Sequence, residues 1–272
     1  MQNGELTKLL TDPGNKRAFY GHLRDLINTV FSRSYLQTWA QHYTTFLPSE
    51  DLTTHLSYVD TRRASVLSAI NNAVPQVPYQ INTTDGSSFN GSFATIQGDA
   101  WVDMFELRVA GASGALTLTW LDDHTWRAQV PIVPGANTIT IAAYDRQGAL
   151  IGSDTVTVIG TGTQVPASAA NLVVSEIMYN PGLPSSAEQA AGFTDPDSFE
   201  FIEVMNISAT ETVNLTDLKF TEGITFSFPT LALAPGTRAL IVGNQAAFQK
   251  RYGTGGTILG QYQAADGSNR LT

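Results

Sequence analysis

The period of the hydrophobic pattern changes at Pro75, and this change constrains the fold more than any other feature of the sequence. Before Pro75, apolar residues recur every three or four positions, which predicts amphipathic helices. Three such stripes cover residues 18–31, 35–47 and 52–74, and Asp12-Pro13-Gly14 separates a short first helix from the second. Proline lacks the amide donor that a helix needs, so Pro75 and Pro78 end the pattern. We therefore expect a helical segment over residues 1–74.

After Pro75 the period is two, and Gly, Pro, Asn and Asp divide the chain into short strands. The clearest strands of a first block are expected at 102–109, 116–121, 126–130, 138–143 and 155–159. Residues 161–170 have no apolar periodicity and are interpreted as a linker. A second block begins at Leu172, with strands expected at 172–177, 199–204, 213–218, 225–228 and 238–242. The sequence thus predicts a multidomain, mainly β protein, in which the helical segment precedes two immunoglobulin-like β-sandwiches at 76–160 and 171–272.

Composition excludes several classes of function. The 272 residues carry a formal net charge of −9 and no cysteine. An acidic chain lacks the basic footprint of a nucleic-acid-binding protein, so no nucleic acid is expected as a partner. No window approaches the roughly 18 consecutive apolar residues of a membrane span. The first residues lack the basic and apolar regions of a signal peptide, so any export signal is expected to lie outside this chain.

The second β block resembles the lamin tail domain family in its bacterial, extracellular form. The resemblance is carried by four motifs in order: Val174-Ser175-Glu176-Ile177-Met178-Tyr179-Asn180-Pro181, Phe199-Glu200-Phe201-Ile202-Glu203-Val204-Met205-Asn206, Val213-Asn214-Leu215-Thr216-Asp217-Leu218 and Leu233-Ala234-Pro235-Gly236. It implies an immunoglobulin-like sandwich without known catalytic activity. Family members continue past the position of Gly260 with a glycine-rich turn and further strands. The resemblance therefore implies that the second sandwich is incomplete and truncated at its C-terminal end.

The first two parts of the chain resemble the downstream region of bacterial proteins of the spore coat protein H (CotH) kinase family. The carrying motifs are Tyr35-Leu36-Gln37-Thr38-Trp39, Tyr58-Val59-Asp60-Thr61-Arg62-Arg63, Trp101-Val102-Asp103 and Pro134-Gly135-Ala136-Asn137-Thr138. The resemblance implies that residues 1–74 are the C-terminal remnant of a kinase-like domain whose catalytic core lies upstream. No motif for the ATP-binding lysine or the metal-binding acids is found in this chain, so no catalytic residue is assigned and the activity is not carried over.

One group of acidic residues is a candidate metal site. Asp195 and Asp197 flank Pro196 in a loop-like sequence, and Glu200 and Glu203 follow closely. Loop carboxylates two residues apart can ligate calcium, which takes six to eight oxygen ligands. The alternative is a solvated acidic turn in which Glu203 accepts hydrogen bonds from amides at a strand end. Calcium is the one cofactor that the sequence suggests.

Three tryptophans of the first block are candidate glycan contacts, because exposed aromatic rings stack on sugars. These are Trp101, Trp120 and Trp126. The alternative is core packing, since a sandwich needs large inward-facing residues. Trp120 and Trp126 flank a probable hairpin turn at 121–125 and are interpreted as a cross-strand aromatic pair.

The sequence favours a non-catalytic region of a larger exported bacterial protein that serves adhesion, protein interaction or spacing. Two alternatives remain: the chain is the C-terminal part of a CotH-like protein kinase, or it is a carbohydrate-binding module. The expected partner is a protein or a cell-surface polysaccharide, and the expected location is extracellular or in the cell envelope.

Overall fold

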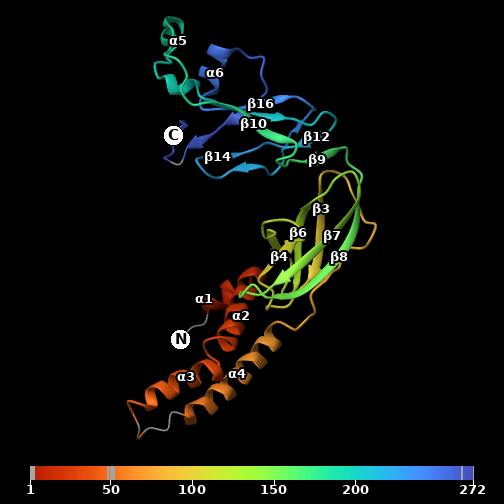
Figure 1. Ribbon diagram of the computed structural model, residues 1–272, viewed down its shortest axis with the longest axis vertical. Helices are drawn as coiled ribbons and strands as arrows, with labels where there is room; N and C mark the ends of the chain where they lie inside the picture. Colours follow the sequence, from red (N-terminus) through yellow and green to blue (C-terminus); the bar gives the residue numbers. More distant parts are fainter. Residues whose placement is uncertain (1–3, 48, 50–52, 265, 272) are drawn as a thin grey trace. The chain divides into compact units, whose positions relative to one another are not determined.

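The computed structural model describes residues 4–47, 49, 53–264 and 266–271 (Figure 1). The chain is a multidomain, mainly β protein with helices at its N-terminal end, as the sequence predicts. It divides into two compact units. The first unit takes the chain up to Phe89 together with Ala94–Val130 and Ala136–Ile159, and the second takes Asn90–Phe93, Pro131–Gly135 and the chain from Gly160 onward.

Four helices form the N-terminal segment, close to the three predicted stripes and the short helix before them. They are α1 (Gly4–Leu9), α2 (Pro13–Asn28), α3 (Arg33–Thr44) and α4 (Thr53–Ala73). Asp12 caps α2, because its carboxylate accepts a hydrogen bond from the Asn15 amide at 2.8 Å. Pro13 occupies the first turn, where its missing N–H costs nothing. Ser32 caps α3 in the same way through the Tyr35 amide.

The helical segment shares a hydrophobic core with the first sandwich. Ile27 of α2 and Ile70 and Val74 at the end of α4 are buried against Trp101 and Val102. The indole Nε1 of Trp101 donates to the carbonyl of Val74 at 3.0 Å. The helices and the first sandwich are therefore parts of one compact unit.

Two four-stranded sheets make up the first sandwich. One has the order β1 (Gln80–Ile81), β3 (Phe93–Asp99), β6 (Thr125–Pro131), β5 (Leu118–Trp120), and the other has the order β2 (Ser88–Phe89), β8 (Leu150–Gly160), β7 (Gly135–Tyr144), β4 (Glu106–Val109). Burial alternates along β3, β6 and the second half of β7, which brings Ile96, Trp126 and Ile141 into the core. This alternation is the period-two pattern seen in the sequence.

The strand predicted at 102–109 is shorter than expected. Residues 101–104 form a turn in which the Met104 amide donates to the Trp101 carbonyl at 3.1 Å, and β4 begins only at Glu106. The turn is buried under the helical segment, so its apolar residues serve a helix contact and not a strand. Val102, Met104 and Phe105 of this loop line a pocket of the first unit.

The described residues of the second unit form three sheets. Their orders are β10 (Leu172–Met178), β11 (Phe201–Asn206), β16 (Arg238–Val242), β17 (Ile258–Gln261); β15 (Ala232–Leu233), β12 (Thr212–Asn214), β9 (Gln164–Pro166); and β13 (Lys219–Phe220), β14 (Ile224–Ser227), β18 (Gln263–Ala264). Strand β9 lies in the segment interpreted as a linker and pairs in parallel with β12. The core includes Val204, Leu215, Phe226, Ile241 and Tyr262.

Short helices complete the second unit. They are α5 (Ser186–Ala190), the 3-10 helix η1 (Pro196–Phe199) and α6 (Gln245–Tyr252). Phe248 of α6 packs on Phe201 of β11, with ring centroids 5.4 Å apart. In neither unit is any helix, within the residues described, both long enough and apolar enough to span a membrane.

Candidate functional site

A pocket in the first unit combines two cations with two aromatic rings. Its volume is about 160 Å³. It is lined by Gly14, Arg17 and Ala18 of α2, Val102, Met104 and Phe105 of the loop before β4, Trp120 of β5, and Arg146 of the turn between β7 and β8. Four separate segments of the chain therefore converge on it.

Arg17 lines this pocket and anchors α2. Its side chain is buried, with only 4% of the residue exposed. Its guanidinium donates to the carbonyls of Ala100 (2.7 Å), Asp123 (2.8 Å) and Trp101 (2.6 Å) and lies 3.5 Å from the ring centroid of Trp120. Burial lowers the pKa of Arg17 to about 10, although neighbouring aspartates oppose this shift. Arg17 stays charged at neutral pH and is held by carbonyl oxygens.

Arg146 also lines the pocket and belongs to the turn between β7 and β8. The Asp145 carboxylate accepts hydrogen bonds from the amides of Gln147 (2.9 Å) and Ala149 (2.8 Å), and Gly148 adopts a φ of 79°. This is the pattern of a tight hairpin turn that ends in a left-handed glycine. The side chain of Gln147 donates to Asp25 of α2, which fastens the turn to the helix.

The guanidinium of Arg146 has an aromatic neighbour and forms no ion pair within the described residues. It lies 4.5 Å from the ring centroid of Phe105. Phe105 itself is 51% exposed and Trp120 is half-buried, so both rings can offer surface at the pocket.

Of the three tryptophans predicted as glycan contacts, only Trp120 lines this pocket. Trp101 is 4% exposed and packs under the helices, while Trp126 is fully buried and stacks on Tyr79 with centroids 6.3 Å apart. Trp101 and Trp126 thus serve the core, which is the alternative that the sequence left open. The interpretation of Trp120 and Trp126 as a cross-strand pair is confirmed, because the two residues are direct partners between β5 and β6.

The four acids proposed as calcium ligands lie in the second unit and do not converge. Asp195 caps η1 by accepting from the Asp197 amide at 3.1 Å. Arg270 contacts both carboxylates, at 3.0 Å from Asp195 and 3.5 Å from Asp197. Glu203 instead accepts from the Ser175 hydroxyl at 2.8 Å. Within the described residues no set of three or more histidines and acids is arranged to hold a metal ion, and calcium binding stays a prediction.

Glu200 is a buried structural carboxylate. It is 2% exposed and accepts hydrogen bonds from the Leu271 amide at 2.6 Å and the Tyr262 hydroxyl at 3.1 Å. Burial raises the pKa of its carboxyl above the usual value, which the two hydrogen bonds partly offset. The group holds the segment at Leu271 against the core.

Arg17, Phe105 and Arg146 were not predicted as site residues. The sequence Asp145-Arg146-Gln147-Gly148 does indicate a turn, and a turn places Arg146 at the surface. Nothing in the spacing links that turn to Trp120 or to a helix more than a hundred residues earlier. Only the tertiary fold brings these residues together.

Comparisons with known proteins show distant structural similarities. A scan against family models gives no match, and neither does a comparison with curated proteins. The fibronectin(III)-like modules of Clostridium thermocellum CbhA are similar at 16% identity and TM-score 0.24, over 31% of this chain and 96% of that one. The glucan utilization protein SGBP-B of Bacteroides ovatus, in complex with a mixed-linkage heptasaccharide, is similar at 10% identity and TM-score 0.22, over 66% and 50%.

The sialic acid binding region of a Streptococcus sanguinis adhesin, bound to 3'sLn, is similar at 13% identity and TM-score 0.22, over 68% of this chain and 49% of that one. The chain thus spans about half the length of the Bacteroides ovatus and Streptococcus sanguinis structures.

Proposed function

We propose that this chain is a non-catalytic adhesion region of a larger exported bacterial protein and that it binds carbohydrate at the pocket of Trp120, Phe105 and Arg146. The observation that carries the proposal is the convergence, in one hollow of the first unit, of two partly exposed aromatic rings and an arginine that has no ion pair in the part of the chain that the structure describes. Aromatic faces stack on sugar rings, and a fixed polar group orients the ligand. An extracellular or cell-envelope location and a lamin-tail-like second sandwich are parts of the same proposal.

The size of the pocket limits what it can enclose. Its volume of about 160 Å³ is below the roughly 300–1,000 Å³ of pockets that surround a drug-sized ligand. We therefore expect it to take a terminal sugar residue of a longer chain, with the rest of the glycan in solvent.

A glycan array tests this function. We expect binding by the intact chain and loss of binding in Phe105→Ala, whose exposed ring can be removed without opening the core. Tyr58→Ala is the matched control, because Tyr58 is an exposed aromatic residue of α4 outside the pocket. Absence of binding to every glycan, or equal loss in both variants, would overturn the proposed function.

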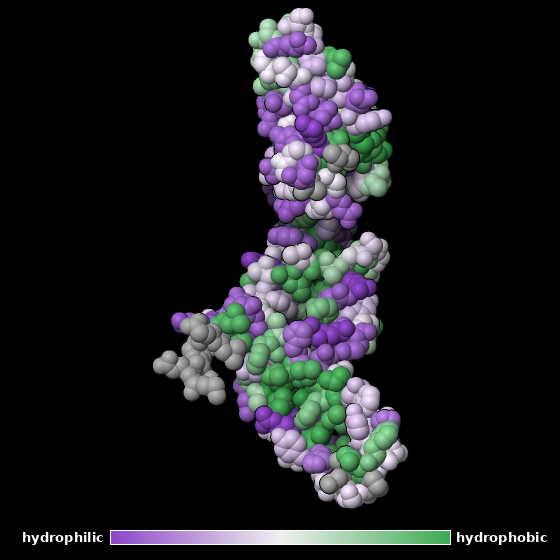
Figure 2. Space-filling view, turned by 90° about the vertical axis from the view of Figure 1, so that its left-hand side faces the viewer, coloured by the Kyte–Doolittle hydropathy of each residue, from purple (hydrophilic) through white to green (hydrophobic). Residues whose placement is uncertain are grey.

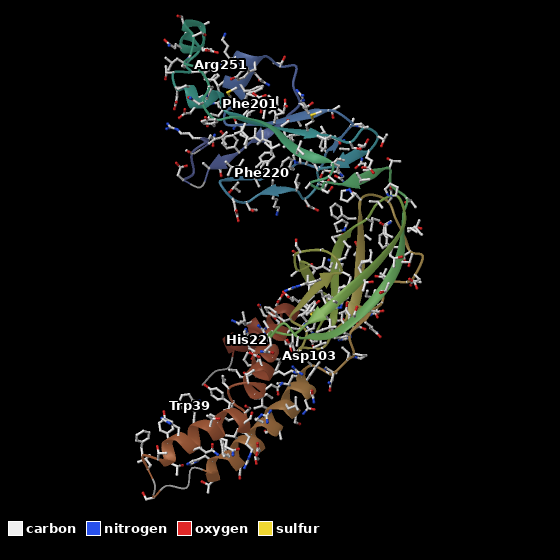
Figure 3. All side chains as sticks on the ribbon, in the orientation of Figure 1. His22, Trp39, Asp103, Phe201, Phe220 and Arg251 are labelled. Atoms are coloured by element: carbon white, nitrogen blue, oxygen red, sulfur yellow. The ribbon has the colours of Figure 1, made fainter. Side chains whose placement is uncertain are left out.

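A second candidate function follows from the surface of α3. No residue of α3 is buried, and its aromatic side chains form a row in which Trp39 stacks on Tyr43 with centroids 6.2 Å apart. Tyr35, Trp39 and Tyr43 are each about half exposed, and Phe46 beyond the helix is 68% exposed. Figure 3 labels Trp39 on this helix, and Figure 2 shows hydrophobic side chains gathered over the helical segment.

A helix with this row is typical of an element that packs against another surface. It supports the alternative that the segment is the end of a CotH-like kinase domain whose catalytic core precedes it. The test is the coding sequence upstream of Met1, together with ATP turnover by this chain. A kinase core upstream and background turnover here support this candidate, and a different upstream domain contradicts it.

A further inference from the structure

We infer that the pocket binds an acidic saccharide through its carboxylate, with Arg146 as the anion-binding residue. The inference rests on the proposed carbohydrate-binding function and specifies its ligand class. It depends on the charges around the pocket and on the way the fold holds Arg146 in place.

Acidic groups near the pocket have partners other than Arg146. Asp123 pairs with Lys16 at 2.5 Å, and Asp103 lies 3.7 Å from the guanidinium of Arg24. Asp145 accepts two amides of its own turn. The positive charge of Arg146 is therefore not neutralised by an ion pair within the described residues.

The guanidinium of Arg146 lies beside α2 at Gly21, where a Cβ atom would lie 3.6 Å from Nη2, 3.9 Å from Nε and 3.0 Å from the carbonyl oxygen of Val102. The Phe105 ring supports the guanidinium at 4.5 Å, and the bond from Gln147 to Asp25 holds the turn. A guanidinium offers two parallel N–H donors, which match a carboxylate. Less conformational entropy is lost on binding when the group is already placed.

The aromatic rings of the pocket favour a sugar over a bare anion. An anion alone would need only cations, but Phe105 and Trp120 line the pocket together with Arg146. Arg17 adds a second positive charge while its own donors are turned to carbonyl oxygens. A ligand that combines a sugar ring with an attached carboxylate satisfies both features. A neutral sugar would leave the charge of Arg146 unmatched.

The experiment compares acidic saccharides with neutral partners of the same skeleton. The probes are oligogalacturonate and its fully methyl-esterified form, sialyllactose and lactose, and a sulfated galactose oligosaccharide. We expect the chain to bind at least one carboxylate-bearing probe and to bind its neutral partner about tenfold more weakly or worse. Raising the salt concentration weakens binding, because screening acts on the exposed charge.

Variants of the chain locate the effect. Arg146→Gln is expected to lose about tenfold or more of the affinity for the acidic probe, since charge-assisted hydrogen bonds contribute about 1.5–3 kcal/mol. Arg146→Lys keeps the charge without the paired donors and should bind at an intermediate level. Arg127→Gln, at an exposed arginine of β6 outside the pocket, is the control and should bind as the parent does.

The outcomes separate the two proposals. Equal binding of acidic and neutral partners, with no effect of Arg146→Gln, overturns the acidic ligand and leaves carbohydrate binding standing. Binding of the sulfated probe alone also overturns the carboxylate. No binding to any probe or to the wider array removes both proposals.

Discussion

Both units contain an arginine stacked on an aromatic ring, and the two clusters differ in how the charge is satisfied. In the first unit Arg17 lies 3.5 Å from the centroid of Trp120, and in the second Arg251 lies 3.4 Å from that of Phe199. Arg251 forms an ion pair with a carboxylate, because Glu188 accepts hydrogen bonds from its Nε at 2.8 Å and its Nη2 at 3.0 Å. The first cluster has a second cation, Arg146, with no carboxylate partner among the residues described.

The partners of each guanidinium distinguish a structural arginine from one that is available to a ligand. Arg251 also donates to the carbonyl of Gly182, and Glu188 completes the capping box of α5 through Ser185. Every charge in that cluster has a partner inside the fold, so it fastens α5 to α6. In the first unit Arg17 likewise fastens α2 through carbonyl oxygens, while Arg146 forms no ion pair among the residues described. Substitutions in the two clusters should therefore affect different properties.

The largest effect is expected from Arg17→Met. Three carbonyls would lose a charged donor, each such hydrogen bond being worth about 1.5–3 kcal/mol with incomplete additivity. We expect the free energy of unfolding of the first unit to fall by about 3 kcal/mol, and its melting temperature by roughly 6–12 °C. All four tryptophans lie in this unit, so tryptophan fluorescence follows its melting alone. An unchanged transition would show that Arg17 does not anchor α2.

A smaller loss is expected in the second unit from Arg251→Met. The variant leaves the Glu188 carboxylate without its cation but keeps the amide and hydroxyl of Ser185 as donors. We expect the melting temperature of the second unit to fall by about a few degrees. Calorimetry measures this change, because all four tryptophans lie in the first unit and their fluorescence does not follow the second. Hydrogen exchange should rise in α5 and α6 and stay unchanged in β7. Equal exchange in parent and variant would contradict a fastening role.

Two carboxylates of the second unit, Glu188 and Glu200, should change its free energy of unfolding in opposite directions as the pH falls. Hydrogen bonds from Arg251, with help from Ser185, lower the pKa of Glu188 to about 2, so its contribution is present above the unfolded value of 4.5 and is lost as pH falls towards 2. Burial raises the pKa of Glu200 above 4.5, so that group favours the folded state more as pH falls from neutral towards 4.5.

Calorimetry from pH 7 to pH 2 separates these two effects. Glu200→Gln should remove the rise in stability between neutral pH and about pH 4.5. Arg251→Met should flatten the loss between about pH 4.5 and pH 2. A Glu200→Gln variant with the same pH profile as the parent would contradict the raised pKa of this carboxyl.

Local pattern was enough to predict several strands, but not the turn before β4, strand β9 or the pocket. The alternating residues of 138–143 predict a strand because every second one is buried, and β7 covers them. The pair of Trp120 and Trp126 follows from a short turn between two strands. Trp101 could not be placed from its neighbours, because its burial depends on Val74 at the end of a helix. Asp195 and Asp197 likewise meet Arg270, which lies more than seventy residues further along the chain.

The smallest effect on stability is expected from Arg146→Gln. This variant therefore tests whether Arg17 and Arg146 differ in their contribution to the stability of the first unit. Its guanidinium has no ion pair to lose among the described residues, and its turn is held by Asp145, Gly148 and Gln147. The change should alter unfolding free energy by no more than about 0.5 kcal/mol, as for surface positions in general. The melting temperatures of Arg146→Gln and Arg17→Met, followed by tryptophan fluorescence, measure the difference. If Arg146→Gln destabilised the first unit as strongly as Arg17→Met, both arginines would be structural, and the charge that we assign to a ligand would already be in use by the fold.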